Sequence, residues 1–486
     1  MSEQRVLLIN PPQRTDLRRI LGLKAPPMGL LYIAAYLEKA GIPVEVLDAD
    51  LLDLSASQIA KQASFKNPYI IGITAITSTI KSAFRVARHV RRVLPNIVII
   101  VGGAHPTFMP EQTLFDCPEI DLVVRGEGEE TMLEIAQTLR DFQWGDYSDV
   151  NQRFSGMKGF EFNEKMSPIK GIAYRNPQNP REVILTPNRP LIEELDSIPF
   201  PARHLVPFER YKVLGKETAL GTIITSRGCP FKCAFCSSSR IVGKKYRARS
   251  PENILQEVEL LHYRYRLKHI ELLDDIFTLN QDRAIKFSEM LRSQKMDVQW
   301  VASSRVDTIS KETMKAMKKA GLMMLYFGAE SGSPRVLKLM NKGITIEKTE
   351  AAFKQAKNLG ISLTGSFILG YPGETLGEMQ QTINFALKLD PEFAQFCILT
   401  PYPGTPIYDE LLKKDLLLTN DWDKYNTLEP VVKYEALGYT YQNVQSMLKK
   451  AYFSFYIRPK FLIKHRRLIP AILKSNIIPQ GLKITL

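Results

Sequence analysis

Three cysteines within eight residues are the part of the sequence best suited to chemistry. Cys229, Cys233 and Cys236 are spaced C-x3-C-x2-C in the stretch SRGCPFKCAFCSSSR. Three thiolates in one short loop need a fourth ligand to complete a zinc site, and no histidine lies nearer in sequence than His204 or His262. A cubane held by three cysteines keeps one iron free to bind a ligand. The spacing therefore favours a 4Fe–4S cluster over zinc or incidental buried cysteines.

The remaining cysteines and the overall composition indicate a reducing compartment. Cys117 and Cys397 are expected to be free buried thiols, because five cysteines in 486 residues cannot form a disulfide framework. A hydrophobic content of 44% excludes a disordered or fibrous chain. No apolar run reaches about 18 residues, and the N-terminal MSEQRVLLIN lacks the features of a signal peptide. We expect a cytoplasmic protein.

The cysteine loop follows the first of six apolar strand patterns that alternate with helical patterns. The strands are expected at residues 222–228, 269–275, 299–307, 324–332, 362–370 and 393–402, and helices between them at 251–264, 281–293, 311–320 and 346–358. This alternation predicts a partial (β/α)6 barrel over residues 216–408, with chemistry at the carboxyl ends of its strands. Residues 409–486 are expected to be helical and basic.

An earlier series of strand and helix patterns predicts a separate α/β domain over residues 1–143. Continuous apolar strands indicate a parallel sheet covered on both faces, which is typical of a doubly wound fold. Residues 144–215 are polar and rich in Asn, Gly and Pro, so we expect a linker with one small hairpin. The strands of the domain are expected at residues 5–10, 43–47, 69–74, 97–102 and 121–125, and those of the hairpin near 171–174 and 182–185.

The cysteine spacing, with Phe235 before the third cysteine, resembles that of the radical S-adenosylmethionine (radical SAM) superfamily. Further motifs extend the resemblance to the subgroup with an N-terminal cobalamin-binding domain, over residues 1 to about 410. These motifs are IELLDDIFTLN (270–280), WVASSRVD (300–307), FGAESGSPRVLKLMNKGIT (327–345), ILGYPGET (368–375) and LTPYPGTPIYDEL (399–411). The resemblance implies three cofactors: a 4Fe–4S cluster, S-adenosylmethionine and cobalamin.

The resemblance also implies where S-adenosylmethionine binds. The free iron would chelate its amino and carboxylate groups, and one electron from the reduced cluster would release a 5'-deoxyadenosyl radical. For Arg305 and Glu330, the alternative to contact with S-adenosylmethionine is a structural ion pair inside the barrel mouth. Gly370, Gly373 and Gly404 either approach adenosine or are simple turn residues. The expected contacts are Phe235, near adenine, and Asp275, Ser303, Arg305, Glu330 and Ser331 at strand ends.

For cobalamin, the candidates follow the strands of the first domain. They are Thr74, Thr77, Ser78, Gly102, Gly103, His105, Glu127 and Gly128. Ordinary sheet turns, solvated hydroxyls and a structural histidine are the alternative interpretations. No G-x-G-x-x-G follows the first strand, which disfavours a dinucleotide. The D-x-H-x-x-G loop that often carries a cobalt-ligating histidine is replaced by NPPQRTD (10–16), and the first histidine is His89. A cobalt face without histidine suits homolytic methyl transfer.

These features favour methylation of an unactivated carbon by a 5'-deoxyadenosyl radical and methylcobalamin, with no side chain acting as general acid or base. Two other functions stay open. One is radical cyclisation or oxidation of a lipid, isoprenoid or tetrapyrrole with cobalamin but without methyl transfer, and the other is a non-catalytic cobalamin sensor. A methylthiotransferase is disfavoured, because Cys117 and Cys397 are too few for a second three-cysteine cluster.

Much of the net charge of +14 lies at the C-terminus. No acidic residue follows Glu435, and nine Lys and Arg residues lie between Lys449 and the end. This segment could rest on a membrane surface, which would suit a lipid, isoprenoid or pigment substrate, or form a helical cap with a solvated basic face. A protein side chain is another possible substrate. We expect an electron donor such as ferredoxin or flavodoxin, and no nucleic acid partner.

Overall fold

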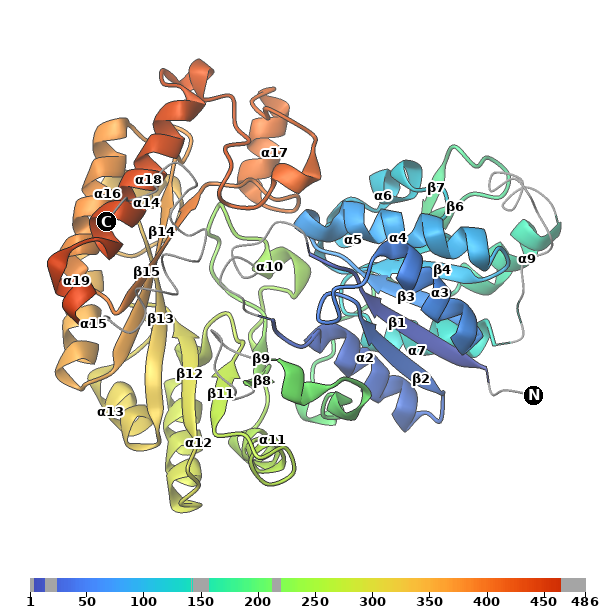
Figure 1. Ribbon diagram of the computed structural model, residues 1–486, viewed down its shortest axis with the longest axis horizontal. Coiled ribbons are helices and arrows are strands. Elements are labelled where there is room, and N and C mark those ends of the chain that lie inside the picture. Colours follow the sequence, from blue (N-terminus) through green and yellow to red (C-terminus); the bar gives the residue numbers. More distant parts are fainter. Residues whose placement is uncertain (1–3, 14–23, 141, 143–156, 212–219, 465–486) are drawn as a thin grey trace. The chain divides into compact units, whose positions relative to one another are not determined.

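The computed structural model describes residues 4–13, 24–140, 142, 157–211 and 220–464. The described residues form two compact units, one ending at Tyr211 and the other comprising residues 220–464 (Figure 1).

The first unit is built on a seven-stranded sheet in the order β2-β1-β3-β4-β5-β6-β7. The first five strands are parallel and lie in the order 2-1-3-4-5. Strand β2 is added on one side of β1 and the later strands on the other, so the topological switch point lies between β1 and β3. The predicted doubly wound parallel sheet is confirmed. The strands are β1 (Arg5–Asn10), β2 (Val44–Asp48), β3 (Pro68–Thr74), β4 (Val98–Gly102), β5 (Leu122–Val124), β6 (Ile172–Arg175) and β7 (Val183–Leu185).

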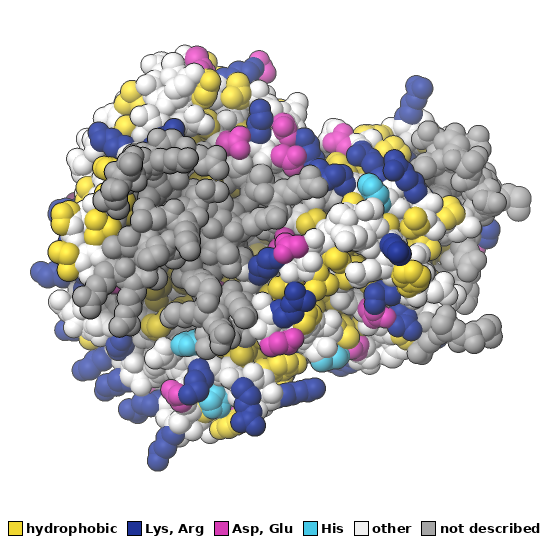
Figure 2. Space-filling view, in the orientation of Figure 1, with side chains coloured by type: hydrophobic (Ala, Val, Ile, Leu, Met, Phe, Trp, Pro, Cys, Tyr) yellow, Lys and Arg dark blue, Asp and Glu magenta, His cyan; other side chains and the backbone are white. Residues whose placement is uncertain are grey.

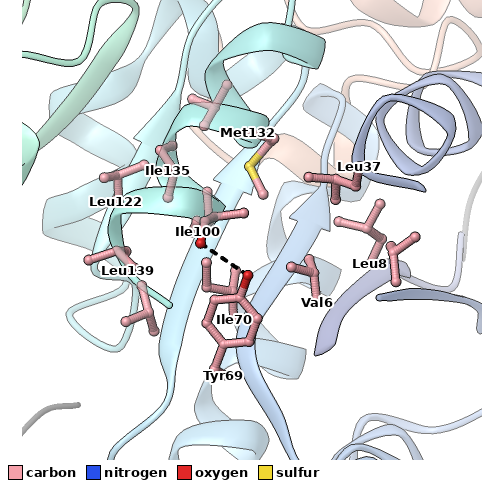
Figure 3. Packing of buried hydrophobic residues seen from close by; sticks show 14 of the residues in the cluster. Val6, Leu8, Leu37, Tyr69, Ile70, Ile100, Leu122, Met132, Ile135 and Leu139 are labelled. Carbon is pink, nitrogen blue, oxygen red and sulfur yellow. Dashed lines mark hydrogen bonds between the residues drawn. The ribbon is translucent and has the colours of Figure 1, made fainter. Parts of the chain in front are cut away.

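The core of this unit lies where alternate strand residues meet two helices. Val6, Leu8, Ile70 and Ile100 point into one cluster with side chains of α2 (Met28–Lys39) and α7 (Glu129–Thr138) (Figure 3). Tyr69 joins the cluster, and its hydroxyl donates to the carbonyl of Ala136 at 3.1 Å. The remaining helices are α3 (Ala56–Lys66), α4 (Ile80–Val93), α5 (Ala104–Phe108), α6 (Pro110–Asp116) and α9 (Met157–Met166).

The predicted hairpin extends this same sheet. Strand β6 pairs antiparallel with β5, and β7 pairs antiparallel with β6, within one residue of the expected positions. The buried guanidinium of Arg175 donates to the carbonyl of Ile120 at 2.7 Å and fixes β6 against the parallel strands. The segment expected to be a linker therefore contributes two strands and α9 to the first unit.

The second unit contains a six-stranded, entirely parallel sheet in the order β8-β11-β12-β13-β14-β15. Neighbours in the sheet are successive in the chain, and helices join them, which confirms the partial (β/α)6 barrel. The strands are β8 (Gly221–Ile223), β11 (His269–Leu272), β12 (Gln299–Ser304), β13 (Leu322–Glu330), β14 (Ser362–Leu369) and β15 (Phe393–Ile398). The main helices are α11 (Pro251–Tyr263), α12 (Gln281–Ser293), α13 (Lys311–Lys319), α15 (Ile346–Asn358) and α16 (Leu376–Leu389).

The last strand, β15, is covered along its edge by α18 (Tyr441–Tyr456). The Tyr452 hydroxyl accepts from the amide of Phe396 and donates to its carbonyl, at 3.3 and 2.9 Å. Tyr456, one helical turn later, does the same for Ala394 at 3.1 and 2.8 Å. Two hydroxyls thus satisfy the backbone groups of an edge strand. Helices α17 (Pro406–Lys413) and α19 (Pro459–Lys464) complete the helical C-terminal region. Within the described residues, no helix has the length and apolar character that membrane crossing requires.

Candidate functional site

The cysteine loop leaves the barrel after β8 and the short strand β9 (Ser226–Arg227). Gly228 opens it with a φ of +94°, and a Cβ atom there would collide with the carbonyl oxygen of Lys245, so only glycine fits. The Cys229 amide donates to the carbonyl of Gly243 at 3.1 Å, and the Cys236 amide to that of Cys233 at 3.2 Å. Cys233 is buried, whereas Cys229 and Cys236 are half-buried. The backbone therefore presents all three thiols from one folded loop.

The donor set suits an iron–sulfur cluster. Burial raises the pKa of the Cys229 and Cys233 thiols, and nearby Lys342 and Arg305 act in the opposite direction at Cys233. The Nη1 atom of Arg305 lies 3.8 Å from the Cys233 sulfur. No three His, Cys, Asp or Glu side chains of the described residues are grouped to hold a single metal ion. The thiolates that hold a cubane each bind a different iron, and cations beside them stabilise the cluster's negative charge.

Arg305 and Glu330, expected near S-adenosylmethionine, are both buried, but they do not pair with each other. Arg305 makes a two-point contact with Asp307, at 2.9 Å for each bond. Glu330 instead accepts from the ammonium of Lys342 at 2.7 Å. Arg305 and Glu330 therefore form no ion pair with each other, but each has a structural ion-pair partner of its own. Sequence reasoning gave no role to Lys342, although it lies inside the quoted motif 327–345.

The other candidates at the strand ends differ in environment. Asp275 is exposed and accepts from the Ser238 hydroxyl at 3.0 Å. Its neighbour Asp274 is buried and accepts from the amides of Thr225 and Ser226 at 2.6 and 3.1 Å, so it holds the start of the cysteine loop. Asp274 was missed because two adjacent aspartates look alike in sequence, and only the fold decides which one points inward.

The two serine candidates also differ. Ser331 is buried, and its hydroxyl lies 3.1 Å from that of Thr382 and accepts from the amide of Ser333 at 3.1 Å. Ser303 is half-buried on β12, opposite Tyr326 of β13. The Ser331 hydroxyl therefore has hydrogen-bond partners within the protein, whereas Ser303 is identified only by its position on β12.

The three glycines of the later loops all have positive φ angles: +73° for Gly370, +86° for Gly373 and +85° for Gly404. The Gly370 carbonyl accepts from the Tyr434 hydroxyl at 2.8 Å, and a Cβ atom on Gly370 would lie 2.8 Å from that same oxygen. The group that lies close to Gly370 is thus the Tyr434 hydroxyl, from the C-terminal region of the chain. Nearby Glu374 is buried, which raises its pKa to about 8.

In the first unit, the cobalamin candidates gather at the carboxyl ends of β3 and β4. Thr74 pairs in register with Gly102, and the backbone at Gly103, with a φ of +114°, leaves no room for a Cβ beside the Ala75 carbonyl. His105 is buried, and its Nδ1 lies 3.3 Å from the hydroxyl of Thr77. Burial lowers the pKa of His105 to about 4, so its ring is neutral at pH 7.

Of the remaining cobalamin candidates, Glu127 and Gly128 make close contacts within the first unit, and Ser78 is half-buried. Glu127 accepts from the Ile192 amide at 2.8 Å, and Gly128 precedes α7, where a Cβ atom would lie 3.0 Å from Ile33. Ser78 is half-buried in the turn before α4. The loop NPPQRTD, where a cobalt-ligating histidine was sought, lies partly outside the described residues.

Two family models match the two units. The B12 binding domain matches residues 15–136, and the radical SAM superfamily matches residues 223–386. The uncharacterized methyltransferase PH0819 of Pyrococcus horikoshii is 42% identical over 464 residues, which are 96% of this chain and 95% of that protein. The chain belongs to the cobalamin-binding radical SAM family. The resemblance drawn from the motifs is confirmed, and so are the three cofactors: a 4Fe–4S cluster, S-adenosylmethionine and cobalamin.

Two further comparisons place this radical SAM enzyme among its relatives. The anaerobic magnesium-protoporphyrin IX monomethyl ester cyclase of Rubrivivax gelatinosus is 32% identical and covers 89% of this chain and 74% of its own. The fold is shared with the radical SAM methyltransferase TsrM from Kitasatospora setae, solved with cobalamin and a 4Fe–4S cluster bound. It aligns with a TM-score of 0.67 and 19% identity, over 85% of this chain and 75% of its own.

Proposed function

We propose that this enzyme methylates an unactivated carbon of its substrate. The observation that carries the proposal is the similarity, along almost the whole chain, to a protein named as a methyltransferase. A second relative, the cytidylyl-2-hydroxyethylphosphonate methyltransferase of Streptomyces wedmorensis, is 30% identical over 85% of this chain. The cofactors supply the chemistry: S-adenosylmethionine yields both the hydrogen-abstracting radical and the methyl group, which reaches the substrate by way of cobalamin.

In this proposal the chain's own residues bind and orient. Cys229, Cys233 and Cys236 hold the cluster, and the buried cations beside Cys233 offset its negative charge. Arg305 and Glu330 present a cation and an acceptor at strand ends, as the methionine and ribose portions of S-adenosylmethionine require. The other proposed contacts are Phe235, Asp275, Ser303 and Ser331.

The proposed cobalamin contacts serve the same purpose in the first unit. Thr74, Thr77, Ser78 and His105 would hydrogen-bond cobalamin, and Gly102 and Gly103 would let it lie across the strand ends. Because His105 is neutral at pH 7, it offers cobalamin a hydrogen-bonding ring without a charge. Glu127 and Gly128 are proposed to shape the adjoining turn.

One specific observation favours a second function. The cyclase of Rubrivivax gelatinosus is also more than 30% identical, so radical cyclisation or oxidation of a pigment or lipid is the alternative. The test is mass spectrometry of lipids, pigments and proteins from a strain lacking the gene and from its parent, grown with methyl-labelled methionine. A parent-only product that carries one labelled methyl group supports methylation. A product that differs only by hydrogen or oxygen supports the alternative.

The reductant and the membrane contact are further parts of the proposal. A ferredoxin or flavodoxin would supply electrons to the cluster, and a lipid, isoprenoid or pigment would be the substrate. On the face shown in Figure 2, described Lys and Arg side chains lie in several separate places, with Asp and Glu between them. Arg458 and Lys460 both pair with Asp390, the residue that follows α16, so this described part of the basic segment is bound to the barrel unit. The proposed membrane contact depends on residues 465–486, which lie outside the described residues.

A binding assay tests the membrane contact. The intact protein is sedimented with vesicles of neutral lipid and with vesicles that contain anionic lipid. Cosedimentation with the anionic vesicles alone, lost at high salt, is the expected result. No sedimentation with either kind would overturn this part of the proposal and leave the helical cap as the interpretation.

A further inference from the structure

A buried lysine connects the two charged residues expected at the S-adenosylmethionine site. Lys342 is 7% exposed and lies in the turn after α14 (Pro334–Leu339). Its ammonium is 2.7 Å from a carboxylate oxygen of Glu330, and its carbonyl accepts from Nη2 of Arg305 at 2.8 Å. The same ammonium lies 5.7 Å from the ring centroid of Phe235, which precedes Cys236. One residue thus contacts the third strand's arginine, the fourth strand's glutamate and the cysteine loop.

The backbone of β13 is shaped to make this contact. The pairing of β13 with β14 shifts register between Gly328 and Glu330, so the strand bulges there. Glu330 has a φ of +60°, an unfavourable conformation for a residue with a side chain. Bulges and such conformations are frequent beside active sites, where they aim one side chain. A Cβ atom on Gly328 would collide with the Glu330 carboxylate and lie 2.8 Å from the Lys342 nitrogen, so glycine leaves the space for the ion pair.

We propose that Lys342 is a positioning residue that holds the Glu330 carboxylate at the end of β13 and places a positive charge beside the cysteine loop. This inference rests on the proposed roles of Cys229, Cys233 and Cys236 as cluster ligands and of Glu330 as a contact of S-adenosylmethionine. Without the ammonium, Glu330 would be a buried carboxylate that has lost its ion-pair partner among the described residues. The cluster would also lose a nearby charge that favours its reduced, more negative form.

The test compares Lys342→Met and Lys342→Arg with the reconstituted native enzyme. Two measurements are made: the dissociation constant of S-adenosylmethionine by equilibrium dialysis, and the cluster's midpoint potential by titration monitored by electron paramagnetic resonance, without S-adenosylmethionine. For Lys342→Met we expect about tenfold weaker binding of S-adenosylmethionine. We also expect an about tenfold lower ratio of reduced to oxidised cluster at a fixed potential, which corresponds to a midpoint potential about 59 mV lower for one electron. Lys342→Arg keeps the charge and should restore most of both properties.

Two matched variants separate positioning from general disturbance. Lys338→Met removes an exposed lysine four residues earlier. Its dissociation constant, and its ratio of reduced to oxidised cluster at a fixed potential, should both lie within twofold of native. The double variant Lys342→Met/Glu330→Gln should bind S-adenosylmethionine no more weakly than Glu330→Gln alone, because both changes break one contact. Its midpoint potential should still lie below that of Glu330→Gln, because only the lysine's charge differs.

The outcomes that overturn the proposal are distinct from a failure of the cluster assignment. Lys342→Met with native iron content would overturn it if its dissociation constant, and its ratio of reduced to oxidised cluster at a fixed potential, both lie within twofold of native. Should Lys342→Met fail to fold, the double variant Lys342→Met/Glu330→Gln replaces it, because it removes both buried charges together. A midpoint potential of this double variant equal to that of Glu330→Gln would overturn the proposal. Alanine substitution of all three cysteines tests the assignment separately, because iron retained by that variant would refute the ligands whatever Lys342 does.

Discussion

Arg305 directs one guanidinium nitrogen at the sulfur of Cys233, 3.8 Å away. The same guanidinium lies 3.6 Å from the ring centroid of Phe231, also in the cysteine loop, and makes its two-point contact with Asp307. The third strand of the barrel is thereby fastened to the loop that carries the cysteines. This contact joins residues 72 positions apart in the chain.

Replacement of Arg305 by lysine should impair the site without removing the cluster. Lysine keeps the charge but cannot make the two-point contact, and hydrogen bonds to charged groups are worth about 1.5–3 kcal/mol. We expect Arg305→Lys to retain its iron and to form 5'-deoxyadenosine at least about tenfold more slowly. Arg292→Lys, on the exposed face of α12, is the control and should match native. An Arg305→Lys enzyme of native rate would show that the two-point geometry is dispensable.

Gly328→Ala should displace the Glu330 carboxylate while the barrel stays folded. The new methyl group would meet flexible side-chain ends, so the expected loss of stability is about 1–3 kcal/mol, as in other overpacked sites. Binding of S-adenosylmethionine should weaken by about tenfold or more, as measured by equilibrium dialysis. Gly29→Ala is the matched control, because a Cβ there meets nothing within 4 Å. Native affinity in Gly328→Ala would count against a role for Glu330 in binding.

The buried ring of His105 should make the stability of the first unit depend on pH. Burial lowers the folded-state pKa to about 4, whereas the unfolded chain takes up a proton near pH 6.5. The unfolded state therefore binds more protons between these values, and stability falls as the pH drops, by about 3 kcal/mol over the full interval. Denaturant titrations of native and His105→Gln protein at pH 7, 6 and 5 check this. The His105→Gln variant should lack this contribution, so native and His89→Gln protein should lose more stability than His105→Gln as the pH falls. Glu374, whose raised pKa acts in the opposite direction, contributes equally to all three proteins and cancels in the difference. Equal slopes in native and His105→Gln protein would contradict the prediction.

Tyr452→Phe should loosen the edge of the barrel. The change removes one oxygen and leaves both backbone groups of Phe396 without that partner, at a cost of about 1–3 kcal/mol. An uncovered edge strand can also pair with another chain, so faster aggregation on heating should accompany the loss. Tyr441→Phe alters an exposed tyrosine at the start of the same helix and should change neither property. Denaturation and light scattering measure both, and a native result for Tyr452→Phe would show that the hydroxyl is unimportant.

Several elements and one motif followed from local sequence. Parallel strands buried on both faces appear as continuous apolar runs, so β3, β4 and β14 lie within two residues of their predicted positions. The cysteine spacing is equally local, because it depends on neighbours in one loop. Helix α9 was missed, and the hairpin was separated from its sheet, since nothing local in residues 144–185 states that β6 will pair with β5.

The sequence by itself determined the family, the cofactors and the alternation of strands and helices, because these depend on short motifs and on the period of apolar residues. Only the tertiary structure decided which charges meet. Arg305 pairs with Asp307 and Glu330 with Lys342, and Asp274 points inward while Asp275 stays exposed. Such choices depend on strand register, on the bulge at Gly328 and on the approach of turns distant in the chain, and a buried charge is stable only where the fold brings its partner.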